Sequence, residues 1–181
     1  NAILDKAGYK KDANGVRMKA VLDIIPYGED WRRAGEYLKQ VMGDIGIQLE
    51  LRYEDVPTWL KRVYHNYDFE MNVNYFYQLP DPVLGVHRHY GTDQIRKGTH
   101  FVNSSRYSNP KLDALLDSGA GEPDAGKRTA KYKEIQQILA EDMPVVNLFE
   151  LEFLVVYNTK LKGVYDSAMG AYGSFREGYI D

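Results

Sequence analysis

Two histidines separated by one residue, His87 and His89, are the clearest metal-binding signal in the 181-residue sequence. On a strand, residues two apart point to the same side and could share an ion. Structural and catalytic zinc sites have three or four protein ligands, and no third ligand is marked by its spacing here. A small metal-dependent enzyme using His87, His89 and an acid is therefore one open alternative. Solvated or hydrogen-bonded histidines are the simpler interpretation.

Basic and aromatic side chains interleave around these histidines. Between residues 87 and 106 a single acid, Asp93, opposes four basic residues: Arg88, Arg96, Lys97 and Arg106. Such a stretch can bind nucleic acid, bind a carboxylate through bidentate arginine contacts, or form a solvated loop. Because the whole chain carries a formal net charge of −3, a small polar or carboxylate-bearing ligand is favoured over nucleic acid. Arg88 is the residue expected to meet its negative group.

A loop that begins with three consecutive aromatic residues is the best candidate for a binding site. Its candidate ligand-binding residues are Tyr75, Phe76, Tyr77, Gln78 and Asp81. Prolines at positions 80 and 82 prevent regular structure, so the loop has a shape of its own. It follows a predicted strand, and ligands settle at strand ends in open α/β sheets. The alternative is that Phe76 or Tyr77 only fills the core beneath the loop.

The hydrophobic pattern predicts the elements that position this loop. Alternating apolar residues predict strands over 16–25, 47–53 and 69–75, and a three-and-four spacing predicts a helix over 31–45. The strand–helix–strand order is a right-handed unit with parallel strands. The predicted helix caps are Asp30, Asp55 and Asn109, and the longest helix is predicted over 124–141. Residues 145–157 alternate like a strand, and residues 83–107 show no period.

These elements predict an α/β fold with a mixed, mainly parallel sheet flanked by helices. The sequence contains no cysteine, which excludes disulfides and cysteine nucleophiles. It has no dinucleotide-binding, P-loop, nucleophile-elbow or HExxH motif, which disfavours the common enzyme classes. The chain opens at Asn1 with residues typical of a helix in progress, as expected for a piece of something longer.

Four stretches resemble the extracytoplasmic solute-binding proteins of the peptide/nickel ABC-transporter family, family 5. The opening residues up to Gly8-Tyr9, then Gly15-Val16-Arg17, resemble the family's LL-x-x-AGY…G-x-R entry to its second lobe. Ile45-Gly46-Ile47, with the segment up to Asp55, resembles its L-x-x-IGI-x-L…D segment.

The other two stretches lie further along the chain. Asp81-Pro82 resembles the final DP of the family's W-x-x-D-x-x-DP loop. The run from Tyr107 through Asn109-Pro110 to Glu141-Asp142-Met143-Pro144 resembles its Y-x-NP-x-LD…ED-x-P segment. All four occur in the family's order over residues 2–164.

The resemblance implies one lobe of a two-lobed periplasmic-binding-protein type II architecture. Residues 1–163 would be the C-terminal ligand-binding lobe, and residues 164–181 a tail that crosses back to the first lobe. The implied function is the solute-binding component of an ABC importer, without catalysis, cofactor or bound metal. It would be periplasmic or lipid-anchored, deliver its solute to a membrane permease and bind no nucleic acid. A stand-alone protein-interaction domain is the remaining alternative.

One position departs from the family pattern. Peptide-binding members hold the amino terminus of the peptide with an acid four residues before the final proline of the loop. This chain has Gln78 there, and Tyr75 stands where the family has tryptophan. An amide can hydrogen-bond but cannot neutralise an ammonium group. The expected solute is therefore a capped or modified peptide, a sugar or an opine-like molecule. Asp81 matches the family's DP acid and is expected to cap the following turn.

Overall fold

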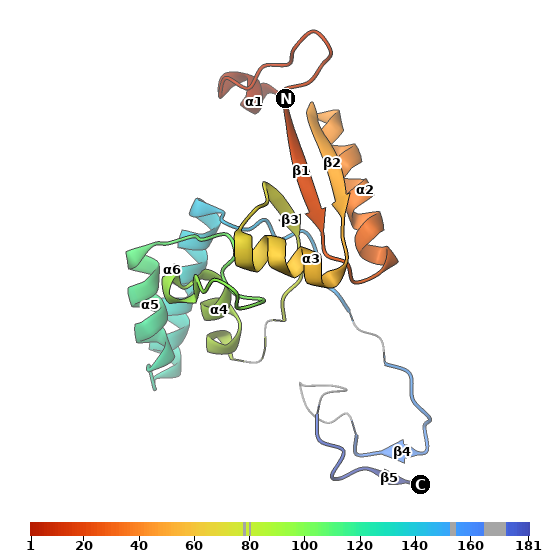
Figure 1. Ribbon diagram of the computed structural model, residues 1–181. Coiled ribbons are helices and arrows are strands. Elements are labelled where there is room, and N and C mark those ends of the chain that lie inside the picture. The colour runs from red at the N-terminus through yellow and green to blue at the C-terminus, as the bar shows by residue number, and fades with distance from the viewer. Residues whose placement is uncertain (78, 80, 153–154, 165–172) are drawn as a thin grey trace. The chain divides into compact units, whose positions relative to one another are not determined.

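The computed structural model describes residues 1–77, 79, 81–152, 155–164 and 173–181 (Figure 1). The chain forms two compact units. The first comprises residues 1–76 and 88–108, and the second comprises residues 77–87 and 109–181. Each unit is described below by itself. The boundary that the sequence predicts after residue 163 stays a prediction.

The first unit is built on a three-stranded parallel sheet with the order β2-β1-β3. Its strands are β1 (Met18–Ile24), β2 (Ile47–Tyr53) and β3 (Met71–Val73). Met18 is level with Ile47 across β1 and β2, and Leu22 is level with Met71 across β1 and β3. The predicted parallel arrangement is thus confirmed, with β1 as the central strand.

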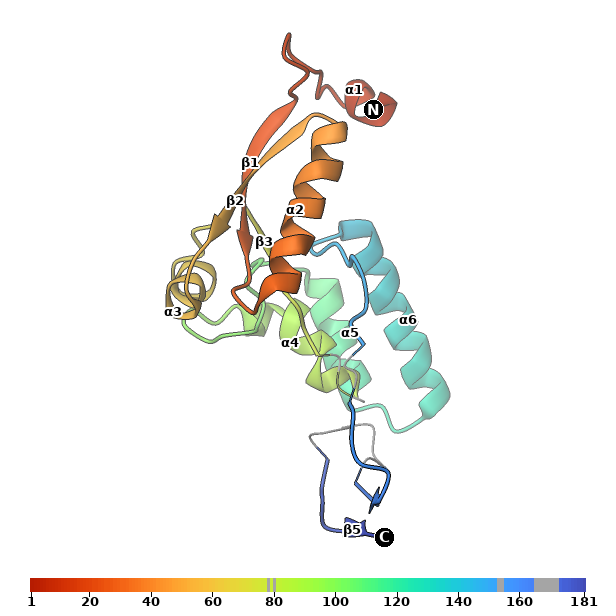
Figure 2. The ribbon, with the colours of Figure 1, turned by 90° about the vertical axis from the view of Figure 1, so that its right-hand side faces the viewer.

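Helix α2 (Glu29–Asp44) lies along one face of the sheet (Figure 2). It covers a cluster of buried residues from all three strands: Leu22, Ile24, Ile47, Leu49 and Val73. The helix approaches β1 closely at Gly35, where a Cβ atom would come within 2.6 Å of the Ile24 side chain. Replacing Gly35 therefore requires the helix or Ile24 to move.

The start of α2 differs from the prediction. The N-cap is Gly28, at a φ of 114°, and not Asp30, which lies inside the first turn with Glu29. The chain turns sharply after Pro26, and a positive φ of this size favours glycine over any residue with a Cβ. The helix therefore starts earlier than a side-chain cap at Asp30 would allow. Both acids still suit the positive end of the helix dipole.

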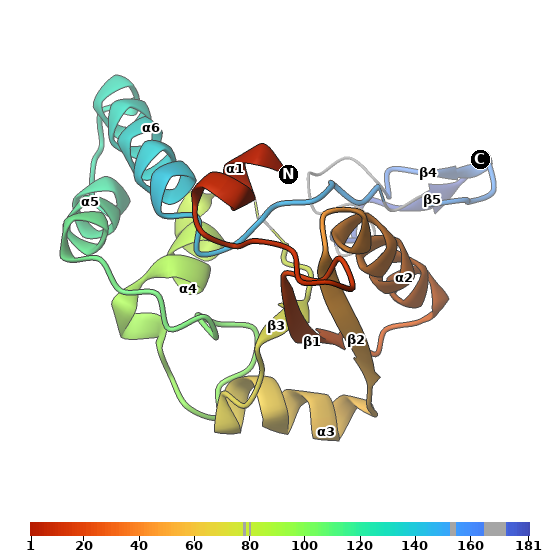
Figure 3. The ribbon, with the colours of Figure 1, turned by 90° about the horizontal axis from the view of Figure 1, so that it is seen from above.

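Helix α3 (Val56–Leu60) and the π-helical turn η1 (Lys61–Asn66) cover the opposite face (Figure 3). Asp55 caps α3 as predicted, because its side chain accepts a hydrogen bond from the Thr58 N–H at 2.8 Å. The second apolar cluster lies beneath these turns and consists of Ile25, Trp59, Val63, Tyr64 and Val102. Trp59, Val63 and Tyr64 are fully buried, so η1 is firmly attached to the sheet.

A buried carboxylate joins this face to the helical layer. Asp23 in β1 is fully buried and accepts hydrogen bonds from Arg52 in β2 at 2.6 and 2.8 Å. Arg62 in η1 lies 3.7 Å from the same carboxylate and also donates to Glu54. The hydrogen bond to Asp23 raises the pKa of Arg52. Both arginines thus stay charged and compensate the buried acid.

The stretch over 83–107, which shows no period in the sequence, contains several short turns of helix. They are η2 (Pro82–Leu84), α4 (Val86–Tyr90) and η3 (Thr92–Gln94). Each has five residues or fewer, too few to produce a readable hydrophobic period. The first helix, α1 (Ala2–Lys6), agrees with the prediction for the opening residues.

The second unit contains the helix pair α5 (Pro110–Ala120) and α6 (Ala125–Asp142). The predicted cap at Asn109 is confirmed, and Asp124 caps the second helix. Asn109 accepts hydrogen bonds from the Lys111 and Leu112 N–H groups, and Asp124 accepts one from Lys127. The helices pack closely where Gly119 faces Tyr132. A Cβ atom added at Gly119 would lie only 3.3 Å from the Tyr132 ring.

The strand predicted over residues 145–157 is absent from the described part of that segment. Instead, many of its apolar side chains are exposed: Val146, Leu148, Phe149, Leu151, Val155, Val156 and Tyr157. A strand needs a neighbouring strand for its hydrogen bonds, and alternation alone does not supply one. The short strands β4 (Leu161–Lys162) and β5 (Tyr179–Ile180) pair antiparallel further along. None of the described helices has the length and apolarity to cross a membrane.

The buried Asp23 network provides a direct stability test. We expect Asp23→Ala to lower the free energy of unfolding of the first unit by about 3–5 kcal/mol, because the substitution leaves Arg52 and Arg62 without their shared carboxylate. Urea unfolding followed by tryptophan fluorescence measures this unit specifically, since both Trp31 and Trp59 belong to it.

Asp68→Ala is the matched control. Asp68 also pairs with Arg62, but its side chain is 68% exposed. Its removal should therefore cost less than about 1 kcal/mol. Equal losses in the two variants would contradict a central role for the buried network.

Candidate functional site

Three aromatic rings meet at the carboxyl ends of β1 and β3. Tyr27 follows β1, Tyr75 follows β3, and Trp31 stands in the first turns of α2. The Tyr75 ring stacks on Trp31, with centroids 5.2 Å apart and an interplanar angle of 24°. Tyr27 meets Tyr75 edge-on at 5.9 Å. We call these three residues the aromatic edge.

Backbone and side-chain hydrogen bonds set the position of the aromatic edge. The Ile25 N–H donates to the Val73 carbonyl at 3.2 Å and extends the pairing of β1 with β3 by one residue. Asn74 accepts from the Tyr75 N–H at 2.9 Å and donates to the Tyr64 hydroxyl at 2.7 Å. Burial raises the pKa of Tyr64 to about 12, so its hydroxyl stays neutral. Tyr75 is thus anchored to the core through its neighbour.

The rings remain accessible to a ligand. Tyr27 is 40% exposed, while Trp31 and Tyr75 are half-buried. Rings that are held on one side and open on the other can stack against a sugar ring, a peptide plane or another aromatic group. Tyrosine hydroxyls add hydrogen-bonding capacity at the rim. The arrangement is suited to binding and contains no nucleophile–base pair.

Phe76 and Arg88 belong to the same unit as the aromatic edge. The Phe76 ring lies against buried His89, with centroids 3.7 Å apart. Burial and, to a smaller extent, the neighbouring charge of Arg88 together lower the pKa of His89 to about 4. The Arg88 Nε atom is buried and finds no hydrogen-bond partner among the described residues. A buried guanidinium atom without a partner fits a residue that awaits an acceptor.

The other predicted site residues belong to the second unit. Asp81 accepts from the Val83 N–H at 2.9 Å, which confirms that it caps the following turn. Its carboxylate also pairs with Arg128 at 2.8 and 3.0 Å, and this contact lowers the pKa of Asp81. The Asp81 carboxylate therefore has a structural role, as a cap and as the partner of Arg128. The Tyr77 side chain is 39% exposed, and Gln78 lies outside the described residues.

The histidines His87 and His89 do not form a shared binding site. His87 and His89 lie on helix α4 rather than on a strand, and residues two apart do not face each other on a helix. The His87 Nε2 atom is 3.0 Å from the Tyr132 hydroxyl, whereas His89 packs on Phe76. Across the described ranges, no group of three or more His, Cys, Asp or Glu side chains could hold a metal ion.

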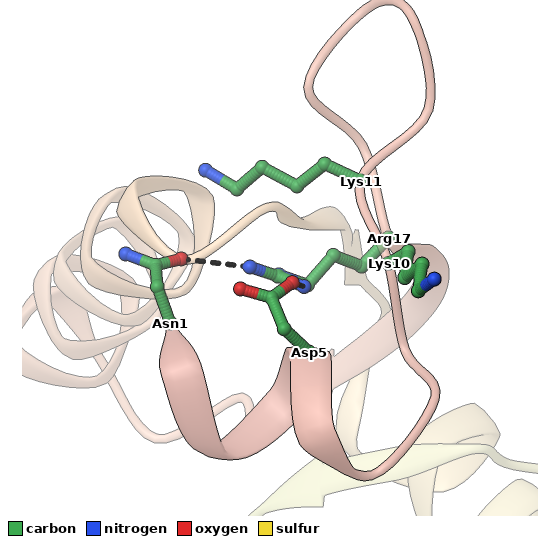
Figure 4. A pocket seen from close by; sticks show the side chains of 5 residues that line it. All are labelled: Asn1, Asp5, Lys10, Lys11 and Arg17. Atoms are coloured by element: carbon green, nitrogen blue, oxygen red, sulfur yellow. Dashed lines mark hydrogen bonds and ion pairs between the residues drawn. The ribbon is translucent and has the colours of Figure 1, made fainter.

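A shallow, open pocket of about 470 Å³ lies at the other end of the sheet, beside the start of β1 (Figure 4). Its lining residues are Asn1, Asp5, Lys10, Lys11 and Arg17. Arg17 is nearly buried and donates to Asp5, Asn1 and the Tyr9 and Ile45 carbonyls. These contacts tie the amino-terminal segment to the sheet. The guanidinium group is already satisfied, which favours a structural role.

Sequence reasoning identified Tyr75 but missed Tyr27 and Trp31. The sequence pattern places Trp31 within the predicted helix over 31–45 and gives Tyr27 no role. Both follow the predicted strand over 16–25 by a few residues, so an aromatic pair just past a strand end is the signal that could have found them.

The buried His89 predicts a pH dependence of stability. Its folded pKa of about 4 lies below the unfolded value of 6.5, so the unfolded state binds the proton more tightly. We expect the stability of the first unit to fall as pH drops from 6.5 towards 4, by on the order of 3 kcal/mol. His89→Gln should flatten this slope in urea titrations. An unchanged slope, or an NMR titration of His89 near 6.5, would contradict the assignment.

Comparison with known sequences finds similarity to dipeptide- and tripeptide-binding proteins. No protein-family model matches it. Di/tripeptide-binding protein 1 of Pseudomonas aeruginosa is 26% identical over 171 residues, which cover 94% of this chain and 30% of that protein. The probable D,D-dipeptide-binding periplasmic protein DdpA of Escherichia coli is 26% identical over 135 residues, 74% of this chain and 25% of that protein.

Solved structures show the same fold. NikZ from Campylobacter jejuni, in complex with Ni(L-His), matches 95% of this chain and 35% of its own, with a TM-score of 0.79 and 19% identity. A putative peptide-binding protein AppA from Clostridium difficile matches 99% of this chain and 36% of its own, with a TM-score of 0.69 and 23% identity.

These findings agree with the resemblance found in the sequence motifs. The two structural matches confirm the predicted α/β fold with a parallel sheet flanked by helices, as in part of a periplasmic binding protein. Family members are periplasmic binding proteins, not enzymes. The chain is thus similar to part of the peptide/nickel family of ABC-transporter solute-binding proteins and spans between 25% and 30% of the length of the curated relatives it matches.

Proposed function

We propose that this chain supplies one lobe of a solute receptor for an ABC importer and that the solute rests on the aromatic edge. The observation that carries the proposal is the cluster of Tyr27, Trp31 and Tyr75 at the carboxyl ends of two adjacent parallel strands. Open α/β sheets bind ligands at this edge. Accessible aromatic surface is also the usual lining of small-molecule sites.

The solute is a small polar molecule with a planar or apolar part that the rings can stack on. The relatives are described as binding di- and tripeptides, D,D-dipeptides and Ni(L-His). Gln78 supplies an amide where peptide-binding relatives have an acid, which favours solutes without a free ammonium group. Capped or modified peptides, sugars and opine-like molecules meet this condition. Arg88 receives a negative group of the solute through its buried Nε atom.

Residues 1–163 act as the ligand-binding lobe, and residues 164–181 belong with a first lobe. Support comes from the exposed apolar side chains between Val146 and Tyr157 and from the short span of the relatives that the chain covers. A large contiguous apolar surface usually marks a contact with another part of a protein. Solute binding would shift an open–closed equilibrium of the two lobes. The closed, periplasmic or lipid-anchored receptor then docks on its permease.

Substitution of the stacked rings tests where the solute binds. In the complete protein that contains this chain, Tyr75→Ala and Tyr27→Ala should each weaken solute binding about tenfold, because a lost stacking contact is worth up to about 1.5 kcal/mol. A thermal-shift panel of di- and tripeptides, their N-acetylated forms, sugars and opines first identifies a solute. Calorimetry then compares the variants.

Tyr37→Ala is the matched control, since Tyr37 lies on the outer side of α2 and is 66% exposed. It should bind like the unmodified protein. If both edge variants also kept full affinity, with unchanged circular dichroism, the proposed location would be wrong.

Substitution of Gln78 tests the solute class. Gln78→Asp should shift preference from N-acetylated towards free-amine peptides, because a carboxylate pairs with an ammonium group and an amide does not. Calorimetry with matched peptide pairs measures the shift in the complete protein. Gln40→Asp makes the same charge change on the exposed side of α2 and serves as control. Unchanged selectivity in Gln78→Asp would remove Gln78 from the site.

A further inference from the structure

Two histidines that are distant in the sequence come together on the first unit. The Nε2 atoms of His65 and His100 lie 3.4 Å apart, and their ring centroids are 5.5 Å apart. Both side chains are exposed, so an ion in solution can reach them. The pair lies 35 residues apart in the chain, and no spacing rule could have revealed it.

The backbone on both sides of the pair is held in place. His65 follows Tyr64, whose side chain is fully buried and whose carbonyl accepts from the Gly98 N–H at 2.8 Å. His100 packs against the Tyr64 ring, with centroids 5.9 Å apart, and lies two residues before buried Val102. Both imidazoles are therefore presented by anchored segments, which lowers the entropic cost of binding an ion between them.

Gly98 adds a second constraint on the same geometry. Its φ is +85°, and a Cβ atom there would stand 3.3 Å from Cε1 of His65. The turn just before His100 thus needs glycine both for its positive φ and for the space beside the His65 imidazole. The His65 ring occupies a defined place beside this turn.

The separation of the two nitrogens matches the coordination of zinc. Zinc binds histidine nitrogen at about 2.0–2.1 Å in tetrahedral geometry, which separates two ligand nitrogens by about 3.3–3.4 Å. We propose that His65 and His100 form a surface site for Zn²⁺ or a similar divalent transition metal. In the direct hydrogen bond one ring carries its proton on Nε2. On metal binding that ring changes tautomer, so its proton moves from Nε2 to its own Nδ1. Each of the two Nε2 atoms then donates a lone pair to the ion.

Two protein ligands define the expected strength of the site. Since no third His, Cys, Asp or Glu joins them among the described residues, water completes the coordination shell. Hard cations that prefer oxygen ligands, such as Mg²⁺, should not bind. The site is independent of the solute proposal, because it uses neither the aromatic edge nor the loop over 75–82.

Calorimetric titration of the untagged chain with ZnCl₂ tests the proposal. We expect one Zn²⁺ per chain, no heat of binding with MgCl₂, and a melting temperature that rises with Zn²⁺ concentration. His65→Gln and His100→Gln should each weaken Zn²⁺ binding by at least about tenfold. His87→Gln also removes one histidine but leaves the pair intact, and it should bind Zn²⁺ like the unmodified chain.

Circular dichroism checks that the variants fold, as expected for exposed positions. Absence of Zn²⁺ binding by the unmodified chain would show that the two rings only share a hydrogen bond. Unchanged Zn²⁺ binding by a variant that carries both His65→Gln and His100→Gln would place the ion elsewhere. Either result would overturn the proposal.

Discussion

The buried carboxylate of Asp23 is the constraint on which the first unit depends. It lies in the central strand and is held by Arg52 from β2 and approached by Arg62 from η1. An unpaired charge in this position would be strongly destabilising, so the three elements must assemble in one register. Because β1 pairs with both neighbours, that register also decides where β1 and β3 end and where their following aromatic residues meet.

The candidate site follows from this arrangement. Parallel strands that start and end in register present their next residues on one edge, and here those residues include Tyr27 and Tyr75. The rings continue through Phe101 and Tyr64 to His100 in a series of neighbouring contacts. The same packed aromatic layer therefore supports both the proposed solute surface and the proposed metal pair.

Local signals in the sequence were reliable where a side chain acts on its own backbone. Asp55 and Asn109 cap their helices as predicted, and Asp81 caps the turn that follows it. Prediction failed where a longer-range contact decides. Gly28 replaces Asp30 as a cap, because the path of the chain into α2 needs a positive φ. Residues 145–157 alternate like a strand, yet their described part has no strand partner.

The sequence by itself determined the parallel α/β unit, most helix caps, the aromatic character of the loop and the family resemblance. These depend on periodicity, capping and motifs, which neighbouring residues carry. Tertiary structure alone decided that Tyr27 and Trp31 join Tyr75, that His87 and His89 face apart, and that His65 meets His100. The contacts of Tyr75 and the His65–His100 pair join residues tens of positions apart, so their geometry exists only after the strands pair and the turns pack. The directions of His87 and His89 follow from the helical conformation of α4.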